Sequence, residues 1–263
     1  MPLRTTTYAL LLRSVDFSES DKIVHLLTPG EGRLTAIAKG ARRSVKRFPG
    51  TLDIFNHLRV QTYQSRPGRM VHLEQARLVS PFERLRVLPQ RFALACYLLE
   101  MIDRIAPEGG SSPDCKRLFD FTLGALRVIS ESEPDPRLRV FLELRALDAA
   151  GLRPELRLCV RCGREPSPPG PVGFHVGDGG PVCKRCEQHN DGLVSVNLGT
   201  LRALHQSLCL PFDKLDRLAI GAQSLAEADR VVARFTRFHV GFELKSERFL
   251  AEVLDQPELS LTS

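Results

Sequence analysis

The chain has 263 residues, which exceeds the usual size of a single domain and predicts two or three folded units. Hydrophobic residues make up 43% and charged residues 26% of the chain, a balance typical of globular proteins that excludes extensive disorder. The net charge is only +6, but between residues 33 and 73 nine Lys or Arg residues occur with one acid, Asp53. This concentration indicates a polyanionic partner for the N-terminal region.

A membrane surface is the competing polyanion, but no basic amphipathic helix accompanies these charges. The N-terminal apolar run, residues 8–12, is too short for a signal peptide or a membrane span, and no later run is long enough. We therefore expect a soluble cytoplasmic protein without a membrane partner.

Alternating apolar and polar residues predict five strands within the first 80 residues. The expected ranges are 5–15, 22–28, 33–39, 52–63 and 70–79, with turns at 29–32 and 66–69. Five short strands without a long helix are typical of a small barrel, and the OB-fold is the best-known such barrel that binds nucleic acid. An SH3-like barrel fits nearly as well on strand count alone.

The third strand leads into a basic segment that ends near Phe48. Residues 33–47 contain six cations and no acid, which is what a loop that tracks phosphates requires. A solvated charge run is the alternative interpretation. Most aromatic residues of the barrel are expected in its core, and Phe48 is the one that we favour as a candidate for base stacking. The candidate phosphate contacts are Arg33, Lys39, Arg42, Arg43, Lys46 and Arg47, with Arg59, Arg66 and Arg69 as weaker candidates whose orientation the sequence leaves open.

From residue 81 the apolar period changes to 3.6, which predicts helices. The expected helices are 90–105, 113–130, 136–150, 198–208, 224–240 and 246–254. Gly151 is the expected C-terminal cap of the third, and Ser224 with Glu227 has the spacing of a capping box. Asp103, Glu143 and Asp148 are interpreted as solvated helix positions. The fold class is α+β multidomain: a barrel at 1–80, and a helical bundle at 81–263 interrupted by an insert at 155–195.

The insert carries the strongest motif of the chain. Cys159 and Cys162 form one C-x-x-C pair, Cys183 and Cys186 form another, and 20 residues separate the two pairs. This spacing predicts one structural Zn²⁺ held by four thiolates, with no open position to activate water. A pair of disulfides or a redox pair is the alternative. His175 and His189 are close enough in sequence to replace a cysteine ligand.

Common catalytic motifs are absent from the sequence: there is no phosphate-binding loop, zinc-protease helix, nucleophile elbow or dinucleotide fingerprint. The carboxylates are scattered rather than clustered for metal-assisted hydrolysis. We expect a binding protein and not an enzyme. The competing hypotheses are an RNA-binding factor with a zinc ribbon, an enzyme that uses zinc as a Lewis acid, and a scaffold for an acidic protein.

Several segments resemble the RecO family of bacterial recombination mediators in DNA repair. The match includes Arg13, Glu19, Asp21, Thr28 and Gly32, then the step from Ala38 to Gly40 and the arginines that follow it. Residues 238–241 and 245–250 resemble the closing segment of the family, so the resemblance covers essentially the whole chain. The cysteine pairs are not universal in that family.

The resemblance implies a non-enzymatic, nucleoid-associated protein with an OB-fold. Such proteins bind single-stranded and double-stranded DNA and anneal complementary strands. They act with RecR to load RecA onto strands coated by the single-stranded-DNA-binding protein.

Overall fold

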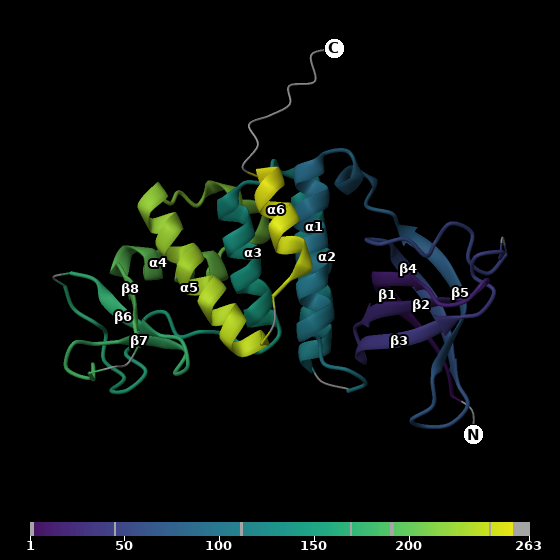
Figure 1. The fold of residues 1–263 in the computed structure, drawn as a ribbon, viewed down its shortest axis with the longest axis horizontal. Helices are drawn as coiled ribbons and strands as arrows, with labels where there is room; N and C mark the ends of the chain where they lie inside the picture. Colours follow the sequence, from purple (N-terminus) through teal and green to yellow (C-terminus); the bar gives the residue numbers. More distant parts are fainter. Residues whose placement is uncertain are drawn as a thin grey trace, which may run out of the picture.

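The computed structural model describes residues 3–254 except residues 45, 111, 112, 169, 190, 191 and 242. A β-barrel forms one end of the molecule, helices form the middle, and a small three-stranded sheet forms the other end (Figure 1). None of the helices within the described part of the chain is long and apolar enough to cross a membrane.

Five strands close into the barrel in the order β1-β2-β3-β5-β4. Neighbouring strands are antiparallel, except that β3 and β5 are parallel and share only two residue pairs. This is the OB-fold predicted from the strand pattern. The alternation of the sequence explains the interior, because every second side chain of β3 and β4 points inward and is buried. In β1, residues 9–12 are all buried, because the outward side chains of Leu10 and Leu12 pack in the core shared with the helices. The strands are β1 (Leu3–Asp16), β2 (Lys22–Thr28), β3 (Gly32–Ala38), β4 (His57–Gln64) and β5 (Val71–Ser80).

The fourth strand starts later than the sequence predicts. β4 begins at His57 and not at residue 52, because Phe55 has a φ of 70° and turns the backbone. The Phe55 side chain is fully buried and meets the ring of Phe92 edge-on, 5.5 Å between centroids. The expected strand is therefore shortened by a turn that anchors the barrel in the helical core.

The helices that follow agree with the predicted ranges to within a few residues. Asp135 caps α3 by accepting a hydrogen bond from the Leu138 amide, and Gly151, with φ 81°, follows the helix as predicted. α1 and α2 lie against the barrel, and α6 packs on α1 (Figure 1). The elements are η1 (Glu83–Arg86), α1 (Pro89–Ile105), α2 (Pro113–Glu131), α3 (Pro136–Ala149), α4 (Leu198–Cys209), η2 (Phe212–Arg217), α5 (Ala222–Val240) and α6 (Lys245–Leu254).

The barrel and the helices share one hydrophobic core. Leu10, Leu12, Leu27 and Phe55 from the barrel belong to the same buried cluster as the helix residues, while a second cluster fills the barrel interior. Burial of apolar surface, worth roughly 25 cal/mol per Å², therefore stabilises the junction as well as each part.

Two predictions about acidic residues are wrong. Glu143 is 2% exposed and accepts hydrogen bonds from Tyr97 and Thr236, at 2.9 and 2.6 Å. Burial raises the pKa of Glu143, and the nearby Arg139 counteracts only part of this rise. Asp103 is 6% exposed, whereas Asp148 is half-buried beside Arg117. Both wrong assignments come from helix positions that face other elements and not solvent.

The predicted capping box is also absent. α5 begins at Ala222, and Glu227 is 9% exposed. Its carboxylate accepts hydrogen bonds from the Asn197 backbone and the Thr200 hydroxyl at the start of α4, at 2.9 and 2.7 Å. A long-range partner has replaced the local one that the spacing suggested.

The insert forms a small antiparallel sheet in the order β7-β6-β8. Its strands are β6 (Val172–His175), β7 (Gly180–Val182) and β8 (Val194–Val196). Phe174 is fully buried and contacts the ring of Phe235 on α5, at 6.4 Å between centroids. The helical core thus supports the sheet from one side.

Candidate nucleic-acid interface and metal centre

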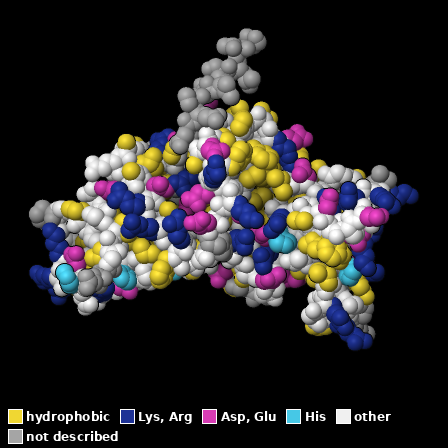
Figure 2. All heavy atoms as spheres, viewed as in Figure 1, with side chains coloured by type: hydrophobic (Ala, Val, Ile, Leu, Met, Phe, Trp, Pro, Cys, Tyr) yellow, Lys and Arg dark blue, Asp and Glu magenta, His cyan; other side chains and the backbone are white. Residues whose placement is uncertain are grey.

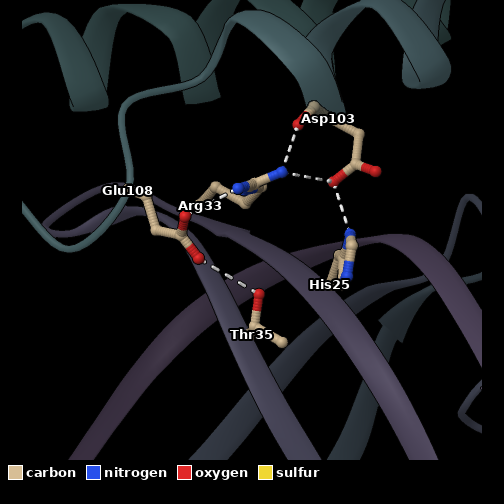
Figure 3. A network of polar contacts seen from close by, with 5 residues as sticks. All are labelled: His25, Arg33, Thr35, Asp103 and Glu108. Atoms are coloured by element: carbon tan, nitrogen blue, oxygen red, sulfur yellow. Dashed lines mark hydrogen bonds and ion pairs between the residues drawn. The ribbon is translucent and has the colours of Figure 1, made fainter. Parts of the chain in front are cut away.

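Arg33, the first cation of the basic stretch, lies at the junction of barrel and helices. Its guanidinium donates to the backbone carbonyl of Asp103 at 2.9 Å and to the carboxylate of Glu108 at 2.7 Å (Figure 3). His25 Nδ1 lies 2.7 Å from Asp103 Oδ1, and Thr35 donates to Glu108 at 3.4 Å. The Arg33 side chain is 23% exposed. The structure therefore places Arg33 in a network that joins β2 and β3 to the end of α1.

The backbone beside Arg33 approaches the helices just as closely. Gly32 has a φ of 67°, and a Cβ atom there would lie 2.3 Å from the carbonyl oxygen of Pro107. The Arg33 amide donates to that same carbonyl at 2.8 Å. Only glycine satisfies both the positive φ and the contact, so this position fixes the barrel against the bundle.

The remaining cations of the stretch lie in a loop that is tethered at both ends. We call residues 39–47 the basic loop. At its start, the Asp21 carboxylate accepts from the Gly40 amide at 2.8 Å, and this hydrogen bond lowers the pKa of Asp21. At its end, the Ala76 amide of β5 donates to the Arg47 carbonyl at 3.1 Å. The loop is therefore part of the barrel wall.

The cations of the basic loop are exposed: Lys39, Arg42, Arg43, Lys46 and Arg47. Arg42 lies 3.6 Å from the Asp16 carboxylate, and Arg47 donates to the Lys39 carbonyl at 2.6 Å. The side chains of Arg43 and Lys46 form no hydrogen bond or ion pair with another residue that the structure describes. Such cations remain available to an external anion.

Phe48 does not lie on the surface. Its side chain is 4% exposed and belongs to the cluster inside the barrel, and the Arg47 guanidinium lies 5.3 Å from its ring centroid. The prediction that Phe48 stacks on bases is therefore wrong. The loop crosses one end of the barrel, and Phe48 fills the interior there.

The three weaker candidates lie elsewhere on the barrel. Arg59 is exposed on the outer side of β4, opposite Arg77 of β5. Arg66 and Arg69 lie in the turn between β4 and β5, where they line an open cavity of about 480 Å³ with Met70 and His72. In Figure 2, dark-blue Lys and Arg side chains follow the right-hand margin of the barrel and its lower tip.

The four paired cysteines converge at the far end of the molecule. Their sulfur atoms all lie within 4.8 Å of one another, and Cys162 Sγ lies 3.7 Å from Cys183 Sγ. Four sulfurs around Zn²⁺ at about 2.3 Å would lie about 3.8 Å apart. Gly163 has the positive φ, 70°, that the first turn requires. The group can hold one tetrahedral metal ion.

The acidity of two of these thiols is shifted in opposite directions. Burial alone would raise the pKa of Cys159, but backbone N–H groups that point at its sulfur lower it to about 6. Contacts with the sulfurs of Cys183 and Cys162 raise the pKa of Cys186 to about 12. A metal cation placed among the four sulfurs would favour their thiolate forms.

Neither a disulfide nor a histidine ligand is present at the cluster within the described part of the chain. All described cysteines are free thiols, and the 3.7 Å between two sulfurs is far from a disulfide bond of about 2.05 Å. His175 accepts a hydrogen bond from the Asp178 amide at 2.8 Å, and the group that could hold a metal contains only cysteines.

The architecture is an OB-fold barrel joined to a helical bundle, with a four-cysteine cluster inserted in the bundle. In other proteins, OB-fold barrels bind oligonucleotides or oligosaccharides. Two family models match the chain: "Recombination protein O N terminal" over residues 1–82 and "Recombination protein O C terminal" over residues 89–248. The chain belongs to the RecO family.

Curated relatives match over nearly their full length. A protein of Symbiobacterium thermophilum is 33% identical over 242 residues, which cover 92% of this chain and 94% of the relative. A protein of Anaeromyxobacter dehalogenans is 33% identical over 255 residues, with 95% and 97% covered. Both are named "DNA repair protein RecO". Membership of this family supports a role in DNA repair and recombination.

Proposed function

We propose that this protein is a non-enzymatic mediator of recombination in the cytoplasm, associated with the nucleoid. It binds single-stranded and double-stranded DNA and anneals complementary strands. Together with RecR it helps to load RecA onto DNA coated by the single-stranded-DNA-binding protein. Family membership supports the general role, and the exposed basic loop is the observation that carries the DNA-binding part.

The basic loop suits a phosphate backbone because its cations are exposed while its main chain is tethered. Lys39, Arg42, Arg43, Lys46 and Arg47 would contact phosphates and release the counterions condensed on DNA. Such contacts position the nucleic acid without reading its sequence. Arg59, Arg66 and Arg69 extend the positive surface across the barrel. We assign Arg33 to the junction instead, because its guanidinium is already bonded to the helices.

Annealing follows from the same chemistry. Two complementary strands repel one another through their phosphates, and a dense set of fixed cations lowers that repulsion while the strands approach. No bond to the DNA needs to form or break, so the activity requires no catalytic residue.

We propose that Cys159, Cys162, Cys183 and Cys186 hold one Zn²⁺ with a structural role. Bound Zn²⁺ would satisfy all four thiolates and fix the two turns that carry them. The site lies at the opposite end of the molecule from the barrel, which supports a role in stability and not in DNA contact (Figure 1).

Charge reversal in the loop tests the DNA-binding proposal. In the triple variant Lys39→Glu, Arg42→Glu, Arg43→Glu, we expect sharply weaker binding to DNA of any sequence. The slope of log affinity against log salt should fall by about 2 to 3 units because three phosphate contacts are lost. Fluorescence anisotropy with a labelled oligonucleotide at several salt concentrations measures both quantities.

A matched control reverses three exposed arginines of α4 and α5: Arg202→Glu, Arg230→Glu, Arg234→Glu. This variant has the same net charge but leaves the barrel intact, so its affinity should remain close to that of the unmodified protein. Equal affinity of the loop variant and the unmodified protein would contradict the proposal. Zinc content and circular dichroism should be the same in all three proteins.

A further inference from the structure

The outer surface of strands β1, β4 and β5 carries arginine and tyrosine side chains that strand pairing does not require. Because side chains alternate along a strand, residues paired across the three strands share one face. The register forms three outward rows: Arg4, Tyr63 and His72; Thr6, Gln61 and Gln75; Tyr8, Arg59 and Arg77. We call these residues the β1-β4-β5 face.

This face is positively charged. Arg59 and Arg77 are exposed, directly opposite one another, and neither side chain bonds to another residue that the structure describes. Like charges in opposite positions destabilise a sheet. The nearby acid, Glu74, lies where the pairing of β4 and β5 shifts, and it pairs with Arg4 at 3.2 Å. Repulsion between Arg59 and Arg77 thus lowers the stability of the sheet, and an anionic ligand would reduce that repulsion.

The face also carries two accessible tyrosines. Tyr8 is 50% exposed, and its ring centroid lies 5.6 Å from that of His57. Tyr63 is half-buried between Arg4, 5.8 Å from its ring centroid, and His72, 6.3 Å away. Aromatic rings flanked by cations form the usual platform for the bases of a single strand.

The face continues into the basic loop and the turn between β4 and β5. The hydrogen bond from Ala76 to Arg47 places the end of the loop beside β5, between the rows that contain Gln75 and Arg77. At the other end, His72 lines the same cavity as Arg66 and Arg69. A polymer that leaves the loop can therefore pass from Arg59 and Arg77, over an uncharged row of Thr6, Gln61 and Gln75, to the cations beside Tyr63 and in the turn.

The neighbouring face of the barrel offers no such surface. On β2 and β3, Ile23 is paired with Ile37, and His25 with Thr35. Arg33 of that face is bonded to Asp103 and Glu108, and Arg13 of β1 is paired with His25 at its border.

We propose that the β1-β4-β5 face binds single-stranded DNA, with bases stacked on Tyr8 and Tyr63 and phosphates held by Arg59 and Arg77. This inference rests on the proposed function and extends it. The loop binds by charge alone, whereas this face binds bases through their flat sides. Stacking leaves the pairing edges of the bases free, so a strand held on this face can still meet its complement.

The tyrosines provide a direct test because the chain contains no Trp and only three Tyr. The third, Tyr97, is 3% exposed in the helical core and donates to Glu143. Oligothymidylate should quench the emission of Tyr8 and Tyr63 in parallel with binding followed by anisotropy of a labelled oligonucleotide. In the double variant Tyr8→Phe, Tyr63→Phe, binding should persist while this quenching is lost. Heparin, a polyanion without bases, should bind without the same quenching.

Substitution then measures the contribution of the face. Tyr8→Ala should weaken binding of oligothymidylate about tenfold, as expected for the loss of one stacked base. Phe238→Ala, at an exposed aromatic residue of α5, is the matched control and should leave affinity unchanged. Arg59→Glu with Arg77→Glu should weaken binding further and flatten its dependence on salt.

The outcomes separate this inference from the function on which it rests. Suppose that DNA binds the unmodified protein without quenching its tyrosine emission, and that charge reversal in the loop abolishes this binding. That result would overturn the proposal for the β1-β4-β5 face and leave the proposal for the basic loop intact. If the loop variant still shows tyrosine quenching at higher oligonucleotide concentration, the result would support binding at the β1-β4-β5 face independently of the loop. Absence of any DNA binding by anisotropy would overturn both.

Discussion

The barrel surface and the cysteine cluster lie at opposite ends of the molecule, and each gathers chemical groups of one kind (Figure 1). Four thiols converge within 4.8 Å, whereas the cations of the barrel spread over a loop, a turn and a sheet face. Groups that converge on a point suit a single ion, and groups spread along a surface suit a polymer. The difference supports the two proposals made above: a structural metal ion held by the cysteines, and an external polyanion bound by the cations of the barrel.

Removal of the metal site gives the strongest test of the separation between the two ends of the molecule. Cys159→Ser should abolish binding of Zn²⁺ and unfold the β6-β7-β8 sheet, because structural zinc contributes on the order of 10 kcal/mol of binding free energy to small zinc domains. Metal content by mass spectrometry and hydrogen exchange across residues 157–196 measure the effect. DNA affinity of the remaining structure should change little.

Cys209→Ser is the control for that experiment, since Cys209 is exposed and lies outside the cluster. A loss of DNA affinity in Cys159→Ser, with the barrel still folded, would contradict the separation of the two ends.

Phe48, the buried aromatic residue that directly follows the basic loop, gives the next largest effect. Phe48→Ala should lower the free energy of unfolding by about 3–5 kcal/mol, because it leaves a cavity inside the barrel. Urea denaturation measures this change, and Phe17→Ala, at a side chain that is 61% exposed, is the control. If Phe48→Ala left the stability unchanged and weakened binding of single strands, Phe48 would contact DNA and not fill the barrel interior.

Two cations of the same stretch sharpen the contrast between structure and binding. Arg33→Gln should cost roughly 1.5–3 kcal/mol of stability, because it removes charged hydrogen bonds at the junction, and should leave the salt slope of DNA binding unchanged. Lys46→Gln should have the opposite pattern. Its free energy of unfolding should stay within about 0.5 kcal/mol of that of the unmodified protein, and its salt slope of DNA binding should fall by about 1 unit. Denaturation and salt titration of both variants decide the assignment, and identical behaviour of the two would refute it.

The sequence predicted features that depend on local spacing. The alternation of the barrel strands, the ends of α3 and the convergence of the cysteines all follow from residues close to one another in the chain. Long-range contacts escaped prediction. Arg33 looked like its basic neighbours because its partner, Asp103, is 70 residues away. Glu227 has the spacing of a capping box, but its carboxylate instead accepts a hydrogen bond from Asn197 at the start of α4.

The candidate site shows the same limit. The sequence identified the basic loop but gave no orientation for Arg59, because that orientation depends on the register of β4. Tyr8 and Arg77 gave no signal by themselves, since only strand pairing brings them into one row with Arg59. Phe48 was misjudged because its burial depends on how the loop crosses the barrel end.

The tethers of the basic loop have a consequence for the entropy of binding. Hydrogen bonds from Gly40 to Asp21 and from Ala76 to Arg47 fix the main chain before any DNA arrives. Association then restricts only long side chains, at roughly 0.5–1.5 kcal/mol for each one that becomes immobile. Because those side chains need not lock in one geometry to satisfy phosphates, the proposed binding mode would let a strand slide along the loop while it remains bound.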